Sequence, residues 1–149
     1  MDDEVTAAAI SVGMSVGKTL AGQGIEVIGL GNIGERSMLS ALAVTTAIMK
    51  EDLKKASEKT GFALKISDVG DFAKDPVGTL SIVGSAEIAA LFGLVVEAAR
   101  CNMMVVFDNA VTGAAVLGAV TAYSEIRNFV IPSVYYEEPV HQMQMQKLG

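Results

Sequence analysis

The segment from Ile25 to Ser37 constrains the fold more than any other part of the chain. Residues 25–30 are mostly apolar, as in a buried strand, and glycines follow at positions 29, 31 and 34. An apolar helix is predicted to begin at Ser37. Backbone amides at a glycine turn between a strand and a helix can hold a phosphate group. The segment therefore predicts an α/β unit with an anion site at the turn.

The glycine spacing of this turn also matches the fingerprint of dinucleotide-binding folds. That reading requires an acidic residue at the end of the next strand, about twenty residues further on. Glu51 and Asp52 stand at that distance, but they fall where one predicted helix passes into another. The spacing alone therefore does not predict NAD binding, and no cofactor is expected.

The composition suits a sheet that is buried under helices. The chain has 149 residues, of which 51% are hydrophobic. A chain of this length fits one core, and its many small and β-branched residues suit parallel strands covered by helices. We therefore expect residues 1–149 to form a single α/β domain.

Strand and helix signals alternate along the chain. Helices are predicted over residues 3–21, 37–49, 51–59, 85–100, 111–124 and 139–148, with a further start at Asp75-Pro76. Strands are predicted over 25–30, 103–108 and 127–133, with a short strand at 62–66 and a turn or short helix at 68–72. In the first helix, Ala8, Val12, Val16 and Leu20 repeat on one apolar face. The alternation predicts a three-layer sandwich with a mainly parallel, Rossmann-like sheet flanked by helices.

The carboxyl ends of these strands are expected to meet at one rim of the sheet, where ligands bind in such folds. The rim gathers segments 31–37, 108–112 and 133–141. Asp108 can bind a ligand there or fix its own loop through a hydrogen bond, and Ser133 can contact a phosphate. His141 can make a local structural hydrogen bond or serve as a ligand, so both readings stay open.

Charge and rare residues exclude several classes of function. The net charge of −6 argues against a nucleic-acid partner. One cysteine, Cys101, allows no intrachain disulfide and favours an intracellular chain, and no second His or Cys gives metal-ligand spacing. The apolar stretch 86–99 contains two glutamates and is too short to cross a bilayer. We expect a soluble, cytoplasmic protein without a metal, membrane or nucleic-acid partner.

Five stretches carry a family resemblance: Gly31–Leu39, Ser57–Gly61, Asp75–Ala90, Val105–Ala115 and Ser133–His141. In this order they are similar to the motifs G-E-M-G-I-G-N-T-T, G-R-G-T-G, D-P-x-x-x-L-x-x-V-G-G-x-E-I-A-A, V-V-x-D-G-F-x-S and S-A-E-P-G-H. These motifs belong to the nicotinate-nucleotide–dimethylbenzimidazole phosphoribosyltransferase family, which makes α-ribazole phosphate for the lower ligand of cobalamin.

The resemblance implies transfer of phosphoribosyl from nicotinate mononucleotide to a benzimidazole-type base. It also implies a homodimer, or a second chain that supplies further segments of the family fold. No catalytic residue is carried over, so the catalytic group is unknown. Phosphate- and nucleotide-binding roles are carried over to Gly31, Gly34, Arg36, Ser37, Thr60, Gly61, Asp108, Thr112, Ser133, Glu138 and His141.

The sequence departs from the family pattern at several of these motifs. The glutamate of the first motif is Asn32, the glycine after the strand-end aspartate is Asn109, and the glycine before the last histidine is Val140. Family enzymes are longer, and their catalytic glutamate lies in a glycine-rich C-terminal segment. We therefore expect this chain to be inactive alone. Three classes stay open: a transferase completed by another chain, an inactive nucleotide or base binder, and an oligomeric interaction protein.

Overall fold

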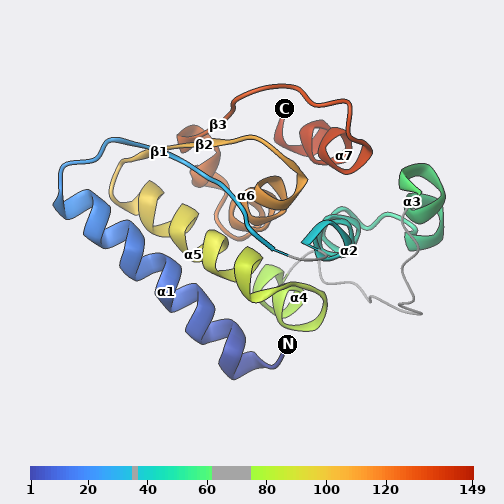
Figure 1. Cartoon of the computed structure of the whole chain (residues 1–149), viewed down its shortest axis with the longest axis horizontal. Helices are drawn as coiled ribbons and strands as arrows, with labels where there is room; N and C mark the ends of the chain where they lie inside the picture. Colours follow the sequence, from blue (N-terminus) through green and yellow to red (C-terminus); the bar gives the residue numbers. More distant parts are fainter. Residues whose placement is uncertain (35–36, 62–74) are drawn as a thin grey trace.

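The computed structural model describes residues 1–34, 37–61 and 75–149 (Figure 1). The predicted segments 62–66 and 68–72 and the candidate Arg36 lie outside these residues. The elements in chain order are α1 (Asp3–Gly22), β1 (Val27–Gly29), α2 (Ser37–Met49), α3 (Leu53–Thr60), α4 (Pro76–Val83), α5 (Ala86–Arg100), β2 (Met104–Phe107), α6 (Ala110–Ala122), the 3-10 helix η1 (Ser124–Phe129), β3 (Val130–Pro132) and α7 (Pro139–Leu148).

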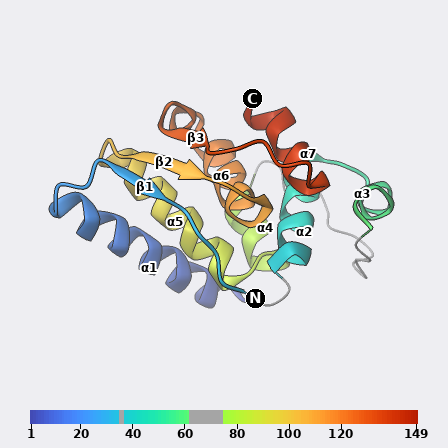
Figure 2. The same ribbon diagram turned by 45° about the horizontal axis from the view of Figure 1, so that its top comes forward.

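The three strands form one parallel sheet in the order β1-β2-β3. Ile28 pairs with Val105, and Val106 pairs with Ile131. Each connection between neighbouring strands passes through helices, as parallel pairing requires (Figure 2). The predicted α/β fold with a parallel sheet is confirmed, and all three strands end at the same edge.

Helices cover one face of this sheet more fully than the other. Ile28, Val105 and Phe107 share the covered face and are buried, where α5 and α6 both contact β2. On the opposite face, Val27 and Ile131 are 57% and 47% exposed. α1 lies against the outer side of α5 (Figure 1). The flanking helices are therefore stacked mainly to one side of the sheet, instead of lying equally on both.

The helices α2 and α6 form the middle of the hydrophobic core. Leu42 and Val44 of α2 and Ala114 and Leu117 of α6 are fully buried. Both helices are apolar around their whole circumference, which is the pattern of a helix enclosed by other elements. They bring their N-termini, at Ser37 and Ala110, close to the carboxyl edge of the sheet (Figure 2).

α1 packs on α5 through glycine and not through its valines. A Cβ atom built on Gly13 would lie 1.8 Å from the carbonyl oxygen of Ala90, so only glycine permits this approach of the two backbones. Val12 and Val16, on the face that the apolar repeat marks, are 60% and 45% exposed. A β-branched side chain would hold the helices apart, and the helix therefore turns its smallest residues inward.

α1 is also a helix that is long and apolar enough to cross a membrane by length and composition. In this fold it lies along α5, and its first turn is tied to α4. The hydroxyl of Ser81 donates a hydrogen bond to the carboxylate of Asp3. α1 therefore packs on α5 and α4 along one side, while most of its residues are not buried.

The predicted helix starts are confirmed by side chains that cap them. Each cap accepts a hydrogen bond from a backbone amide of the first turn, as helix N-termini require. The caps are Asp2, Asp52, Asp75, Ser85, Asn109 and Glu138. The strand predicted over 127–133 is shorter than expected, because residues up to Phe129 belong to η1, which buries Ile126.

Candidate functional site

A pocket of about 270 Å³ lies at the carboxyl edge of the sheet. Its walls come from the loop after β1, the first turn of α2 and the start of α6. The lining residues are Asn32, Gly34, Ser37, Met38, Asn109 and Val111. Two of the three segments expected at the rim, 31–37 and 108–112, therefore meet at this pocket.

The side chain of Asn109 connects two walls of the pocket. Its Nδ2 donates to Asn32 Oδ1 at 2.8 Å and to Asp108 Oδ1 at 2.8 Å. Its Oδ1 accepts from the backbone amides of Val111 and Thr112 at 2.9 and 3.1 Å. One residue thus caps α6 and fixes the loop after β1.

Thr112 and Asp108 add further hydrogen bonds to the network around Asn109. The hydroxyl oxygen of Thr112 accepts from the backbone amides of Asp108 and Asn109 at 3.3 and 3.2 Å, which closes a capping box with Asn109. Asp108 Oδ1 takes part in the same network. The sequence predicts that Asp108 either binds a ligand or fixes its own loop through a hydrogen bond. The structure shows the hydrogen bond within the loop.

Ser37 and Glu87 form a second polar pair beside the pocket. Ser37 Oγ donates to Glu87 Oε2 at 2.5 Å. The other carboxylate oxygen, Oε1, is buried and has no hydrogen-bond partner within the described residues. Gly34 packs on this pair, because a Cβ there would lie 2.1 Å from Ser37 Oγ and 2.2 Å from Glu87 Oε2. The Glu87 carboxylate therefore lies next to Gly34 and Ser37, two of the lining residues, although Glu87 does not itself line the pocket.

His141 belongs to the third strand end but does not line the pocket. Its ring is fully buried, and neither ring nitrogen has a partner in the part of the chain that the structure describes. The rings of Phe107, Tyr135 and Tyr136 surround it, with centroids 6.2, 6.3 and 5.8 Å away. The ring therefore does not make the expected structural hydrogen bond within these residues; only the backbone amide of His141 is bonded, donating to Glu138 Oε2 at 2.8 Å.

The two other candidates near the end of β3 are Glu138 and Ser133. The side chain of Glu138 has a local structural role, whereas that of Ser133 has none within the described residues. Both carboxylate oxygens of Glu138 accept from the first amides of α7, at Val140 and His141. The side chain of Ser133 is exposed, and its backbone amide donates to the carbonyl of Phe107 at 2.8 Å. Glu138 is thus occupied as a helix cap, whereas Ser133 remains accessible at the rim.

Thr60 and Gly61 are placed away from the pocket. They end α3, which lies at the outer edge of the protein beyond α2 and α7 (Figures 1 and 2). Thr60 Oγ1 donates to the Ala56 carbonyl, and Gly61 ends the helix with φ of 75°. Gly31 follows β1 and is exposed at the rim.

The structure thus brings together Gly34, Ser37, Asp108 and Thr112 from the candidate set. It adds Asn32, Asn109 and Glu87, which the set did not contain. Asn109 carried a sequence signal, because an asparagine followed three residues later by a threonine fits a helix cap. Among the described residues, no group of three His, Cys, Asp or Glu side chains is placed to hold a metal ion.

The parallel sheet with a pocket beyond its strand ends defines an α/β protein of the kind that binds ligands at this edge of the sheet. A family model described as phosphoribosyltransferase matches residues 1–149. The chain therefore belongs to this phosphoribosyltransferase family, as the motif resemblance predicts.

Two curated relatives and one solved structure illustrate the match. A nicotinate-nucleotide–dimethylbenzimidazole phosphoribosyltransferase of Acetivibrio thermocellus is 29% identical, over 95% of this chain and 44% of its own length. An enzyme of the same name from Dehalococcoides mccartyi is 26% identical, over 100% of this chain and 46% of its own length. The crystal structure of the Thermus thermophilus protein of that name superposes with a TM-score of 0.85 at 21% identity, over 100% and 47%. The chain spans about half the length of the relatives it matches.

Proposed function

We propose that this chain binds the phosphoribosyl group of nicotinate mononucleotide, as the nucleotide-binding part of a phosphoribosyltransferase that acts on a benzimidazole-type base. The observation that carries the proposal is the pocket at the strand ends, with the Glu87 carboxylate beside it, in a chain that matches the family over its whole length. The names of the relatives support this substrate class.

The chemistry of the pocket suits a sugar. Ribose hydroxyls are hydrogen-bond donors, and the free carboxylate oxygen of Glu87 is a buried acceptor beside the pocket. A ribose hydroxyl that reaches this oxygen would satisfy it. We therefore assign one ribosyl hydroxyl to the Glu87 carboxylate, and leave the backbone amides of the first turn of α2 to another group of the nucleotide.

The phosphate is assigned to the start of α2. The first amides of α6 and α7 already donate to Asn109 and Glu138, so these two helix ends have fewer donors to offer. The N-terminus of α2 follows the glycines after β1, and an anion is stabilised there by backbone amides and the helix dipole.

The transfer reaction also needs a proton acceptor. The bond between the nicotinate nitrogen and the ribose anomeric carbon breaks, a bond to the benzimidazole nitrogen forms, and the imidazole proton leaves to a base. The facing side chains Asn32 and Asn109 are amides, which do not take up this proton. We propose that the acceptor comes from a second chain or from the half of the family fold that these residues do not match.

A second candidate is a nucleotide-binding protein without catalytic activity. The Asn32–Asn109 hydrogen bond favours it, because both side chains are engaged with each other at the place where the family pattern has a glutamate and a glycine. In either case we place the protein in the cytoplasm, with a homodimer or a partner chain of the same family as the working assembly.

Calorimetric titration with nicotinate mononucleotide at low salt and neutral pH tests the binding proposal. We expect saturable binding that Glu87→Gln weakens, whereas Glu125→Gln does not. Glu125 offers the same change of charge and is exposed on η1, at the start of β3 and away from the carboxyl edge. Absence of heat, or equal losses in both variants, would overturn the assignment.

A second measurement separates the two candidate functions. Dimethylbenzimidazole is added to the nucleotide complex, and the release of nicotinate is followed by chromatography, with and without a partner chain of the family. Release that depends on the partner supports the transferase, whereas binding without release under both conditions supports the non-catalytic protein.

A further inference from the structure

The side chain of Asn109 has no hydrogen-bonding capacity left for a ligand. Its Oδ1 accepts from two backbone amides of α6, those of Val111 and Thr112. Both protons of its Nδ2 are used as well, one by Asn32 Oδ1 and one by Asp108 Oδ1, at 2.8 Å each. A side-chain amide has two protons to donate and one oxygen with two lone pairs. Asn109 is therefore a fixed part of the pocket wall.

The same bonds decide how the amide of Asn32 is oriented. Backbone amides can only donate, so the oxygen of Asn109 must lie toward α6 and its nitrogen toward Asn32. Asn32 has to meet that nitrogen with its own oxygen. Its Nδ2 is left over and has no hydrogen-bond partner among the described residues. Because Asn32 lines the pocket and is only partly buried, this amino group is available to a ligand.

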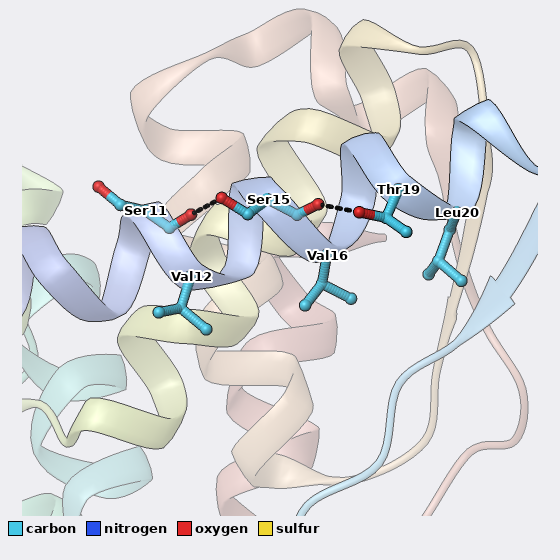
Figure 3. Close-up of a pocket in the computed structure, with 6 residues that line it drawn as sticks. All are labelled: Ser11, Val12, Ser15, Val16, Thr19 and Leu20. Carbon is cyan, nitrogen blue, oxygen red and sulfur yellow. Dashed lines mark hydrogen bonds between the residues drawn. The ribbon is translucent and has the colours of Figure 1, made fainter.

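The groove along the outward face of α1 shows the opposite situation. It has a volume of about 410 Å³ and is lined by Ser11, Val12, Ser15, Val16, Thr19 and Leu20 (Figure 3). Its three hydroxyl groups donate to backbone carbonyls one turn earlier in the same helix, at 2.8 to 2.9 Å. The side chains of this groove therefore offer a ligand no unused proton, although the groove is larger than the pocket of about 270 Å³ at the strand ends.

The base is the part of the proposed nucleotide that remains for the wall formed by Asn32 and Asn109. The phosphate and one ribosyl hydroxyl are assigned to the start of α2 and to Glu87. Two apolar side chains that line the pocket, Met38 and Val111, suit the faces of an aromatic ring. The ring of nicotinate carries one polar substituent, a carboxylate, which accepts hydrogen bonds and donates none.

We propose that Asn32 determines which base the site accepts, by donating a hydrogen bond from Nδ2 to an acceptor atom on the ring substituent of the bound nucleotide. This inference rests on the proposed binding of nicotinate mononucleotide. A donor here favours the carboxylate of nicotinate, because hydrogen bonds to charged groups are roughly twice as strong as those between neutral groups. The family motif has a glutamate at this position, which only accepts, so Asn32 reverses the hydrogen-bonding character of the wall.

Asn32→Asp replaces the donor nitrogen by an acceptor oxygen and adds one negative charge. The aspartate keeps an oxygen for Asn109 Nδ2, so the bond between the two loops should be retained. Asn128→Asp is the matched control, because it makes the same change at an exposed position on η1, away from the carboxyl edge. Urea denaturation checks that both variants are as stable as the native chain.

Two nucleotides of equal charge separate hydrogen bonding from electrostatic repulsion. Nicotinamide mononucleotide and 3-acetylpyridine mononucleotide both offer a carbonyl oxygen, but only the carboxamide can also donate. In calorimetric titrations the native chain should bind the two with similar affinity. Asn32→Asp should bind the nicotinamide form roughly tenfold or more tightly, because the ketone leaves the new carboxylate without a donor. Asn128→Asp should show no such preference.

Nicotinate mononucleotide gives the complementary result. The native chain should bind it more tightly than the nicotinamide form, and Asn32→Asp should reverse this order. Equal affinities of Asn32→Asp for the nicotinamide and acetylpyridine forms would overturn the role of Asn32, and so would an equal loss for all three nucleotides, which would mean that Asn32 meets the ribose or only holds the loop. Both outcomes would leave the binding of nicotinate mononucleotide itself intact. A native chain that binds none of the three would overturn the proposed function and this inference together.

Discussion

The side-chain amide of Asn109 donates to Asn32 Oδ1 at 2.8 Å, across a separation of 77 residues in the chain. The same side chain caps α6 through its oxygen. Asn109 therefore holds both the pocket wall and the first turn of α6. Substitutions of Asn109 can separate its contact with Asn32 from its role as a helix cap.

Asn109→Ala should lower the free energy of unfolding by about 2 kcal/mol, since it removes a helix cap and a hydrogen bond between loops. Asn109→Ser keeps a good capping oxygen but is too short to reach Asn32, so we expect it to lose about half as much. Urea denaturation measures both. Equal losses in the two variants would show that the connection to Asn32 contributes nothing.

Gly13→Ala should destabilise the protein by about 1–3 kcal/mol or more, because the new methyl group would collide with the Ala90 carbonyl oxygen. Gly22→Ala is the control on the same helix. A Cβ at Gly22 meets nothing within 4 Å, and loss of glycine flexibility should leave stability unchanged or raise it by up to about 1 kcal/mol. Thermal or urea unfolding distinguishes the two, and a neutral Gly13→Ala would contradict the close packing of α1 on α5.

His141→Phe should leave stability unchanged or raise it. The buried ring nitrogens have no hydrogen-bond partner in the described residues, and an apolar ring of similar shape avoids the cost of about 1–3 kcal/mol for unsatisfied polar groups. Melting temperature is the readout. A large drop would show that the imidazole nitrogens are bonded in solution, and loss of nucleotide binding at unchanged stability would restore the ligand role.

Ser37→Ala should cost about 1.5–3 kcal/mol, because it removes a hydrogen bond to a charged group and leaves Glu87 with no donor in the described residues. The double variant Ser37→Ala with Glu87→Ala should lose less than the sum of the single variants. A double-mutant cycle in urea measures this coupling. Strict additivity would mean that the two side chains do not interact.

Much of the fold was predictable because its signals are local. A helix start within the next few residues is predicted by Asp75-Pro76, by Ser85 and by Asn109. The apolar run before Asp108 predicts the central strand. The motif resemblance added the family, because it compares the whole order of segments at once.

The orientation of α1 and the polar contacts of the pocket were not predictable in the same way. The apolar repeat of α1 gives the position of its valines, but the face that turns inward depends on how closely the backbone of α5 can approach Gly13. Glu87 reaches Ser37 across 50 residues. Such long-range contacts follow from packing, which no short window of sequence contains.

The backbone contact between α1 and α5 also bears on how the protein moves. A Cβ built on Gly93 of α5 would lie 2.1 Å from the carbonyl of Ile10 in α1, which matches the contact of Gly13 in the opposite direction. With no layer of side chains between them, neither helix can slide or tilt without first separating from the other. Hydrogen exchange should therefore report α1 and α5 as one cooperative unit, with the amides of the middle of α1 as slow as those of α5 although half of that helix faces water.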